Sequence, residues 1–386
     1  MSEELPDSAP AVAPLPNVVE GQCPISADFL PPNMRKHVDV KAPVPLRAMA
    51  AKGLVPLAPS DMVGALFMLT FDPDAGVRET AAKTAGGLPD RILGTALRDE
   101  AVPPPVLAYF LVHVGDKEAY AEMLILNAST PDAAVAQTAL TCSARILEII
   151  GQNQLRILRH DDIIRSLCQN PNASKALIDG VCDFAVRSGM SLADVPAMKE
   201  ARVRLFGPEA AAAPVEQGPT ADALLQEYQE LSDEAASPME EGKRLNLTQR
   251  VMKMSISEKI KLATLGNKEA RTLLIRDSNK LVATAVIRSP RITIGEIRTT
   301  AHSRAVSDDV LRVIYMNKEW TKDYPVKLAL VKNPKVPQAI SMRWMATLRE
   351  SDVKNLANDR NVPSNVRMHA KKMMTKKNAP AKAEGH

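Results

Sequence analysis

The stretch LALVKNPKVPQ, residues 328–338, determines how the rest of the chain is interpreted. An apolar run ends at Asn333-Pro334, and Pro337 follows three residues later. Asparagine tolerates turn geometry, whereas proline cannot continue a helix because it lacks the N–H group. Proline does fit the first turn of a new helix. The stretch therefore predicts a junction at which one helix ends near Lys332 and the next begins at Pro337.

Other segments of residues 250–374 resemble this junction. The segment LVKNPKVPQAI (330–340) aligns without a gap with LANDRNVPSNV (356–366) and with TAHSRAVSDDV (300–310). It aligns with VIRSPRITIGEI (286–297) after one inserted residue, and more weakly with LLIRDSNKLVATAV (273–286). Spacings of this size are typical of stacked helical arrays. The doubled break is therefore interpreted as a repeat junction, followed by a helix with Ile340, Trp344 and Leu348 on one buried stripe.

Local helix signals support this interpretation. SISE at 255–258 has the form of a capping box, and Gly266-Asn267 is expected to end the helix that it begins. Residues 46–206 show the same pattern of helix breaks. An apolar helical segment is followed there by Asp72-Pro73, by the segment from Asn127 to Pro131, and by Asn170-Pro171. An asparagine at such a junction either satisfies loop backbone groups or faces a ligand.

The segment DPDAGVRETAAKTAGGLPD (72–90) and the junctions resemble HEAT-like and leucine-rich-variant helical-repeat proteins. More narrowly, the chain resembles a group of bacterial helical-repeat proteins through LGNKEAR (265–271), RDSN (276–279), KLALVKNPK (327–335) and NVPS (361–364). The resemblance implies an α-solenoid and brings no catalytic residues with it.

Composition and charge divide the chain. Of its 386 residues 45% are hydrophobic but only 3% are aromatic, which is low for a deep small-molecule pocket. Residues 1–241 contain 19 Lys and Arg against 33 Asp and Glu, whereas residues 242–386 contain 30 against 12. Such asymmetry indicates two modules with different partners, or halves that attract each other.

The sequence therefore predicts an all-α protein with two irregular HEAT-like α-solenoid blocks of short helices. The expected divisions are a disordered proline-rich arm (1–45), an acidic helical-repeat domain (46–206), a linker with a short helix at Ala221–Leu231 (207–241), a basic helical-repeat domain (242–374) and a disordered basic tail (375–386).

No motif for nucleotide binding, metal binding or nucleophilic catalysis is present, so no enzyme activity, cofactor or metal is expected. His160-Asp161-Asp162 and Asp308-Asp309 are interpreted as helix starts. Trp320 and Trp344 are interpreted as repeat core. The chain shows no signal peptide and no apolar run long enough to span a membrane. Four scattered cysteines without a CxxC pair favour reduced thiols and a cytoplasmic location.

Basic residues around the junctions are the strongest functional signal. Equivalent positions of a solenoid stack into a row along one edge, which predicts a cationic ridge for an anionic partner. Its members are Arg276, Arg288, Arg291, Arg304, Lys332, Lys335 and Arg360, extended by Arg367, Lys371, Lys372, Lys376 and Lys377. The alternative is a solvated surface that keeps the array soluble.

Three functions fit these features. The first is a non-enzymatic cytoplasmic scaffold that binds protein partners, with an acidic partner for the basic domain. The second is sequence-tolerant binding of nucleic acid through its phosphates by the same domain. The third is association of the basic C-terminal stretch MHAKKMMTKKN (368–378) with an anionic membrane surface.

Overall fold

The computed structural model describes residues 22–209, 219–225 and 241–378. Every regular element in these ranges is a helix and none is a strand, so the protein is all-α, as the sequence predicts. The described residues form two compact units. Unit 1 comprises residues 22–187 and 191–209, and unit 2 comprises residues 188–190, 219–225 and 241–378.

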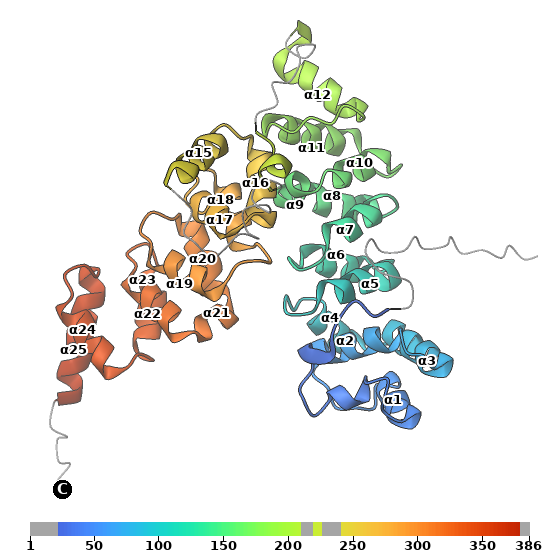
Figure 1. The fold of residues 1–386 in the computed structure, drawn as a ribbon, viewed down its shortest axis with the longest axis horizontal. Helices are drawn as coiled ribbons and strands as arrows, with labels where there is room; N and C mark the ends of the chain where they lie inside the picture. Colours follow the sequence, from blue (N-terminus) through green and yellow to red (C-terminus); the bar gives the residue numbers. More distant parts are fainter. Residues whose placement is uncertain (1–21, 210–218, 226–240, 379–386) are drawn as a thin grey trace, which may run out of the picture. The chain divides into compact units, whose positions relative to one another are not determined.

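The helices of unit 1 follow one another in chain order through the unit (Figure 1). Most pack on helices one to three positions away along the chain, such as α5 on α7 and α7 on α10, or α6 on α8 and α8 on α11. The bounds are η1 Ala27–Phe29, η2 Arg35–His37, α1 Val44–Ala51, α2 Pro59–Leu69, α3 Ala75–Gly86, α4 Asp90–Ala96, α5 Pro104–Val114, α6 Glu118–Leu126, α7 Asp132–Ala139, α8 Ala144–Gln152, α9 Gln154–Arg159, α10 Asp162–Gln169, α11 Lys175–Arg187 and α12 Pro196–Phe206.

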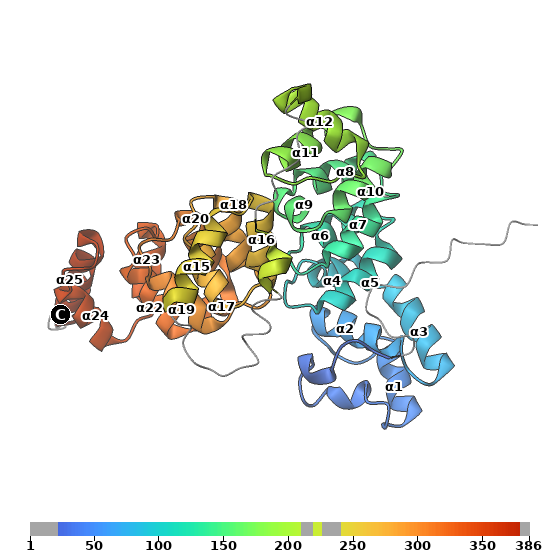
Figure 2. The same ribbon diagram turned by 45° about the horizontal axis from the view of Figure 1, so that its top comes forward.

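From α16 onward the helices of unit 2 also progress in chain order (Figure 2). They form two layers, because α16 packs on α18 and α18 on α20, while α19 packs on α22. The bounds are α15 Glu241–Met252, α16 Ile256–Leu265, α17 Lys268–Leu274, α18 Lys280–Ile287, α19 Ile294–His302, α20 Asp308–Met316, α21 Lys318–Lys322, α22 Tyr324–Lys332, α23 Gln338–Met345, α24 Glu350–Asn358 and α25 Ser364–Asn378.

Short turns reverse the chain between consecutive helices of unit 2, which creates two opposite edges. The ion pair of Lys259 with Asp277, 2.9 Å from Nζ to Oδ2, places the end of α17 beside the start of α16. Edge A, as we name it, carries the turns after α17, α19, α22 and α24. Edge B carries the turns after α16, α18 and α20. α18 connects the two edges, and its eight residues separate them by about 12 Å.

Capping residues define the helix ends as the sequence predicts. Ser255 accepts a hydrogen bond from the Glu258 N–H and begins α16. Asn267 caps α17 after the break at Gly266. Pro337 immediately precedes α23, so the junction that opened the sequence analysis is confirmed.

The proline-rich arm expected over residues 1–45 is wrong for its described part. Residues 22–43 contain η1 and η2 and bury Leu30 and Val38, and α1 already begins at Val44. Phe29 lies so close to Gly64 of α2 that a side chain at Gly64 would collide with its ring. This proline-rich segment is therefore ordered, and it packs over α2 without forming a long helix. We call residues 22–43 the cover of α2. Residues 1–21 lie outside the described residues.

Three smaller expectations are refined. The short helix expected at Ala221–Leu231 is present over residues 221–225, and the rest of it lies outside the described residues. These residues belong to unit 2 and bury Ala221 and Leu224, so they are part of a compact unit and not of a separate linker. α25 continues to Asn378, past the boundary expected at 374. α23 ends at Met345, so Leu348 falls beyond the helix and the expected stripe is shorter. Trp344 is buried in the core, whereas Ile340 is only half-buried.

Candidate functional site

The junction after α22 is held together by one buried amide. The Nδ2 group of Asn333 donates to the carbonyl oxygens of Ala301 and Ser303, each at 2.9 Å. Its Oδ1 accepts the N–H of Lys335 at 3.0 Å. Because the last carbonyls of α19 have no partner within their own helix, Asn333 satisfies acceptors that would otherwise stay unpaired. The side chain thereby links the turn after α22 to the turn after α19.

Unit 1 uses the same arrangement twice. Asn127 donates to the carbonyls of Leu97 and Asp99 at 2.9 and 3.1 Å. Asn170 donates to the carbonyls of Ala139 and Cys142 at 2.9 and 3.1 Å. All three junction asparagines are buried. Their amides are therefore occupied by backbone groups, which confirms the loop-backbone interpretation over a ligand-facing one.

The structure divides the expected cationic ridge between the two edges of unit 2. Arg276, Arg304, Lys332, Lys335 and Arg360 lie at edge A, in or next to the turns after α17, α19, α22 and α24. Arg288 and Arg291 lie in the turn after α18, at edge B, where Ser289 Oγ donates to the Thr264 carbonyl at 3.0 Å. The single row is thus wrong, because consecutive helices run in opposite directions and their C-terminal turns alternate between the edges.

Four of the edge A cations come from three neighbouring turns. Lys335 Nζ donates to the Val306 carbonyl at 2.7 Å, and Arg304 donates to the Asn361 carbonyl. These contacts bring together the turns after α19, α22 and α24. Lys332 and Arg360 form no hydrogen bond or ion pair through their side chains with any described residue. We call Arg304, Lys332, Lys335 and Arg360 the basic cluster.

Many other cations of unit 2 are neutralised by a carboxylate. Arg271 reaches Glu296 at 2.8 Å, and Arg298 reaches Asp323 at 2.6 Å. A hydrogen bond from Arg298 holds the pKa of Asp323 below its ordinary value. The basic cluster differs from these pairs, since none of its members forms an ion pair with a described carboxylate.

Acidic and apolar groups also occur in the edge A turns. Asp308 and Asp309 begin α20, where Asp309 pairs with Lys280 at 2.9 Å and raises the pKa of that lysine. Asp359 accepts the N–H of Asn361 at 2.8 Å. The valines of the three turns point inward and are buried: Val306, Val336 and Val362. The accessible surface of the basic cluster is therefore polar, with carboxylates at its margin.

The remaining expected ridge residues lie on α25. Arg367 is half-buried, and Lys371 and Lys372 are exposed. Through their side chains these three form no ion pair or hydrogen bond with a described residue. The side chains of Lys376 and Lys377 lie outside the described part of the chain.

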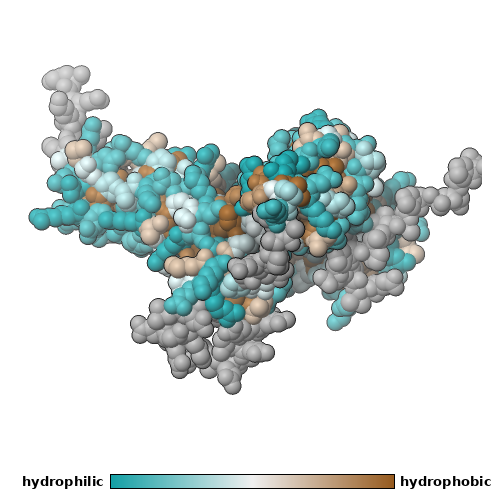
Figure 3. Space-filling view, turned by 90° about the horizontal axis from the view of Figure 1, so that it is seen from above, coloured by the Kyte–Doolittle hydropathy of each residue, from teal (hydrophilic) through white to brown (hydrophobic). Residues whose placement is uncertain are grey.

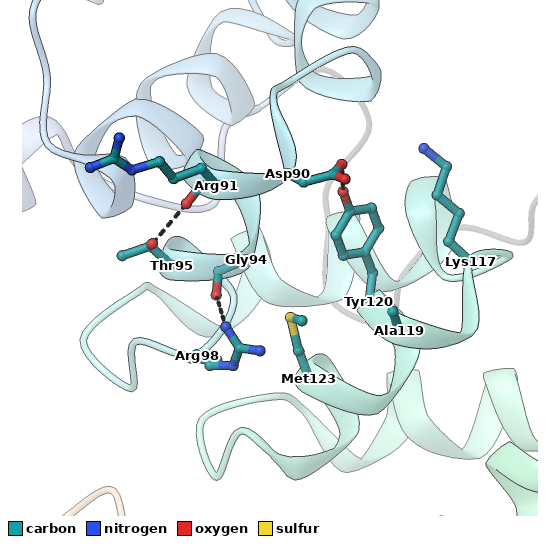
Figure 4. A pocket seen from close by; sticks show the side chains of 9 residues that line it. All are labelled: Asp90, Arg91, Gly94, Thr95, Arg98, Lys117, Ala119, Tyr120 and Met123. Atoms are coloured by element: carbon teal, nitrogen blue, oxygen red, sulfur yellow. Dashed lines mark hydrogen bonds between the residues drawn. The ribbon is translucent and has the colours of Figure 1, made fainter.

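A hollow of roughly 660 Å³ opens between α4 and α6 of unit 1 (Figure 4). Gly94, Met123 and Tyr120 line it, and the Tyr120 hydroxyl donates to Asp90, which raises the pKa of Tyr120. Its cations are Arg91, Arg98 and Lys117. Figure 4 shows Arg91 directed away from α6 and the end of Lys117 directed away from α4. The three charges therefore do not converge on a common point where an anion could bind.

Metal-ligating side chains do not gather in the described part of the chain. Among the described residues, no group of three or more His, Cys, Asp or Glu side chains converges to hold a metal ion. His160 lies 3.7 Å from Asp162 at the start of α10. The four cysteines are free. Cys168 and Cys182 share a hydrogen bond that lowers the pKa of the former thiol and, with burial, raises that of the latter.

Figure 3 shows a largely hydrophilic face on which hydrophobic side chains form small patches. No helix in the described ranges has both the length and the apolar character needed to cross a membrane. Comparison with family models, curated proteins and solved structures gives no match to this chain.

Proposed function

We propose that the protein is a non-enzymatic interaction protein, and that the basic cluster of unit 2 binds an acidic surface of a protein partner. One observation carries the proposal: four cations from three turns lie together without an ion pair to any described carboxylate. An arginine in such a cluster offers several donors in a planar fork that matches a carboxylate. The cluster therefore has unused hydrogen-bonding capacity for an anion.

The packing of the helices supports a scaffold role. In each unit the helices contact mainly their neighbours along the chain, and asparagine side chains link equivalent turns. This is the arrangement that an α-solenoid requires, and solenoids present long surfaces to other proteins. A cytoplasmic location is part of the proposal, because the free thiols suit a reducing compartment.

The geometry favours a protein over nucleic acid. A protein that tracks a phosphate backbone needs many regularly placed cations. The logarithm of its binding constant falls by about 0.9 per contacted phosphate for each tenfold rise in salt concentration. The division of the ridge leaves four clustered cations, of which Lys335 and Arg304 already donate to backbone carbonyls. The carboxylates of Asp308 and Asp359 in the same turns would repel a continuous phosphate chain.

Charge reversal at the two free members tests the proposal. The double variant Lys332→Glu/Arg360→Glu of the full chain is compared with the native chain in fluorescence anisotropy. The probes are labelled poly-L-glutamate and a labelled DNA duplex of about 20 base pairs, each across a salt series. We expect the native chain to bind poly-L-glutamate, and the variant to bind it at least about tenfold more weakly, as the loss of two charged contacts predicts.

The control is Lys354→Glu/Arg312→Glu, which makes the same change of charge in the middle of α24 and α20. This control should bind poly-L-glutamate as the native chain does. Equal weakening in both double variants would show that net charge alone is responsible, and the basic cluster would lose its role. Tighter binding of DNA than of poly-L-glutamate, with a steep salt dependence, would establish the nucleic-acid function instead.

A further inference from the structure

Edge B of unit 2 exposes large apolar side chains, unlike edge A. Leu265 is 46% exposed, Ile294 42% and Met316 67%. Single exposed apolar residues are ordinary on a protein surface, but a contiguous group indicates an interaction site. The question is therefore whether these three side chains lie together.

Contacts between the turns place them in one row. Leu265 ends α16 and Met316 ends α20, with α18 packed between these two helices. The start of α20 lies beside the start of α18, through the ion pair of Lys280 with Asp309, so both helices end at edge B. Arg291 Nη1 donates to the Leu265 carbonyl at 2.7 Å and thereby joins the turn after α18, with Ile294 three residues on, to the end of α16.

Two cations occupy the middle of this row. Arg288 and Arg291 are both exposed, and neither forms an ion pair with a described carboxylate. The carboxylate nearest to them in the sequence, that of Glu296, is already engaged with Arg271. Along edge B, Leu265 and Met316 therefore flank a middle turn that carries Arg288 and Arg291, with Ile294 just after it. This arrangement is complementary to a segment with acidic residues between two apolar ones.

We propose that edge B is a second binding surface, which takes an extended acidic segment of a partner protein between two apolar anchors. Adjacent helices pack about 8–10 Å apart, so the two helix steps from Leu265 to Met316 span about 18 Å. An extended chain advances about 3.3 Å per residue, and alternate side chains share a face. Anchors six residues apart therefore fit the row, with acidic residues two and four positions after the first anchor facing Arg288 and Arg291.

This surface is separate from the basic cluster. The two edges lie at opposite ends of α18, so a partner at one leaves the other accessible. Arginine and methionine, both present in this row, are enriched in protein interfaces. The occupant is assigned as a partner protein because of this charge pattern.

A pair of peptides tests whether the acidic residues must lie on the same face of the bound segment as its apolar anchors. The first, labelled with fluorescein, is Leu-Gly-Glu-Gly-Glu-Gly-Leu, which places both glutamates on the face of the leucines. The second, Leu-Glu-Gly-Gly-Gly-Glu-Leu, has the same composition and places them on the opposite face. Anisotropy titrations with the full chain should show binding of the first peptide at least about fivefold tighter than of the second. Equal affinity for both would overturn the proposed geometry.

Variants of the full chain test the surface. We expect Met316→Ser and Arg288→Glu each to weaken the first peptide about tenfold, since each removes one class of contact. Met368→Ser, on a methionine of α25 that is 65% exposed, is the matched control and should leave binding unchanged. Unchanged binding in Met316→Ser, or equal loss in Met368→Ser, would refute the proposal.

Two further measurements separate the proposals from their alternatives. Lys332→Glu/Arg360→Glu should leave the affinity for this peptide unchanged, so failure at edge B is distinguishable from failure at the basic cluster. Sedimentation velocity of the native chain and of Met316→Ser tests self-association. A concentration-dependent dimer that the substitution abolishes would identify a second copy as the occupant and overturn the assignment to a partner.

Discussion

At the scale of single residues, the junction asparagines show why one residue type recurs at helix ends. An asparagine amide both donates and accepts, so it can satisfy carbonyls of an earlier turn and the N–H of its own turn. An aspartate cannot donate, and the junction at Asp72 differs accordingly. There Asp72 accepts from the Asp74 N–H and binds the buried guanidinium of Arg47. At this junction the guanidinium of Arg47 is the hydrogen-bond donor, whereas at the other junctions the asparagine amide is.

The substitution Asn333→Ala tests the role of the amide. It removes two donated hydrogen bonds and leaves the carbonyls of Ala301 and Ser303 buried without this partner, which costs about 1–3 kcal/mol. Urea denaturation of the full chain, followed by circular dichroism, measures the loss. Asn355→Ala, at an exposed position of α24, is the control and should change stability by less than about 0.5 kcal/mol. Equal midpoints for the two variants would contradict the assigned role.

At the scale of elements, α17 and α19 are joined by a nearly buried ion pair that also belongs to a helix cap. Glu296 binds Arg271, and it accepts from the N–H and hydroxyl of Thr293 in a capping box. Burial raises the pKa of Glu296, but the hydrogen bonds from Arg271 and Thr293 and the charge of Arg271 outweigh burial and lower it. The ionised form therefore stabilises the fold.

The substitution Glu296→Gln should make the contribution of this ion pair to stability visible as a dependence on pH. A lowered pKa means that the stabilisation is complete above the ordinary carboxyl pKa of 4.5 and is lost as the pH falls through the lowered value. At neutral pH the variant should be less stable by about 3 kcal/mol, because Arg271 loses its partner. Denaturation midpoints should converge with those of the native chain as the pH falls through the lowered pKa of Glu296.

A matched variant checks this interpretation. Glu319 pairs with Lys322 on the surface, with side chains 70% and 71% exposed. Glu319→Gln should cost less than about 1 kcal/mol at any pH. A gap between Glu296→Gln and the native chain that stays constant from pH 7 to pH 3 would show that ionisation of Glu296 does not contribute.

The cover formed by residues 22–43 approaches α2 closely at a glycine, Gly64. A methyl group at Gly64 would collide with the Phe29 ring, so Gly64→Ala should displace η1 from α2. Limited proteolysis of the full chain should then cut within residues 22–43 at least several-fold faster. Gly86→Ala is the control, since nothing lies within 4 Å of its added carbon, and it should leave the rate unchanged. Equal rates in both variants would show that the close approach has no structural role.

At the scale of the whole molecule, each unit has its own core and its own junctions. The Arg47–Asp72 pair lies in unit 1, with side chains 5% and 1% exposed, and breaking it costs about 3–5 kcal/mol. Asn333 lies in unit 2. Effects at sites that share no partners usually add. The two units should therefore respond independently to substitutions at these positions.

Calorimetry of the full chain tests this independence. Asp72→Asn should lower the melting temperature of one transition, and Asn333→Ala that of another. The double variant should show both shifts, equal to those of the single variants within error. A single transition that both substitutions displace would mean that the chain unfolds as one cooperative body.

Much of the local structure could be predicted from the sequence. Proline geometry and capping chemistry act within a few residues, so the helix break at Asn333-Pro334, the cap at Ser255 and the all-α class follow from the order of residues alone. The ordered cover over residues 22–43 could not be predicted in this way, because it depends on contact with α2 across some 35 positions of sequence. Its composition contains no signal for that contact.

The candidate site divides along the same line. The sequence by itself determined which basic residues stand at junctions. The tertiary structure decided which four of them form the basic cluster. Only the tertiary structure decided that Arg288 and Arg291 face the opposite edge and stand among Leu265, Ile294 and Met316. The reason is physical: a turn looks alike in sequence whichever way its helix runs, whereas the direction of each helix, and so the edge its turn occupies, is set by packing between layers.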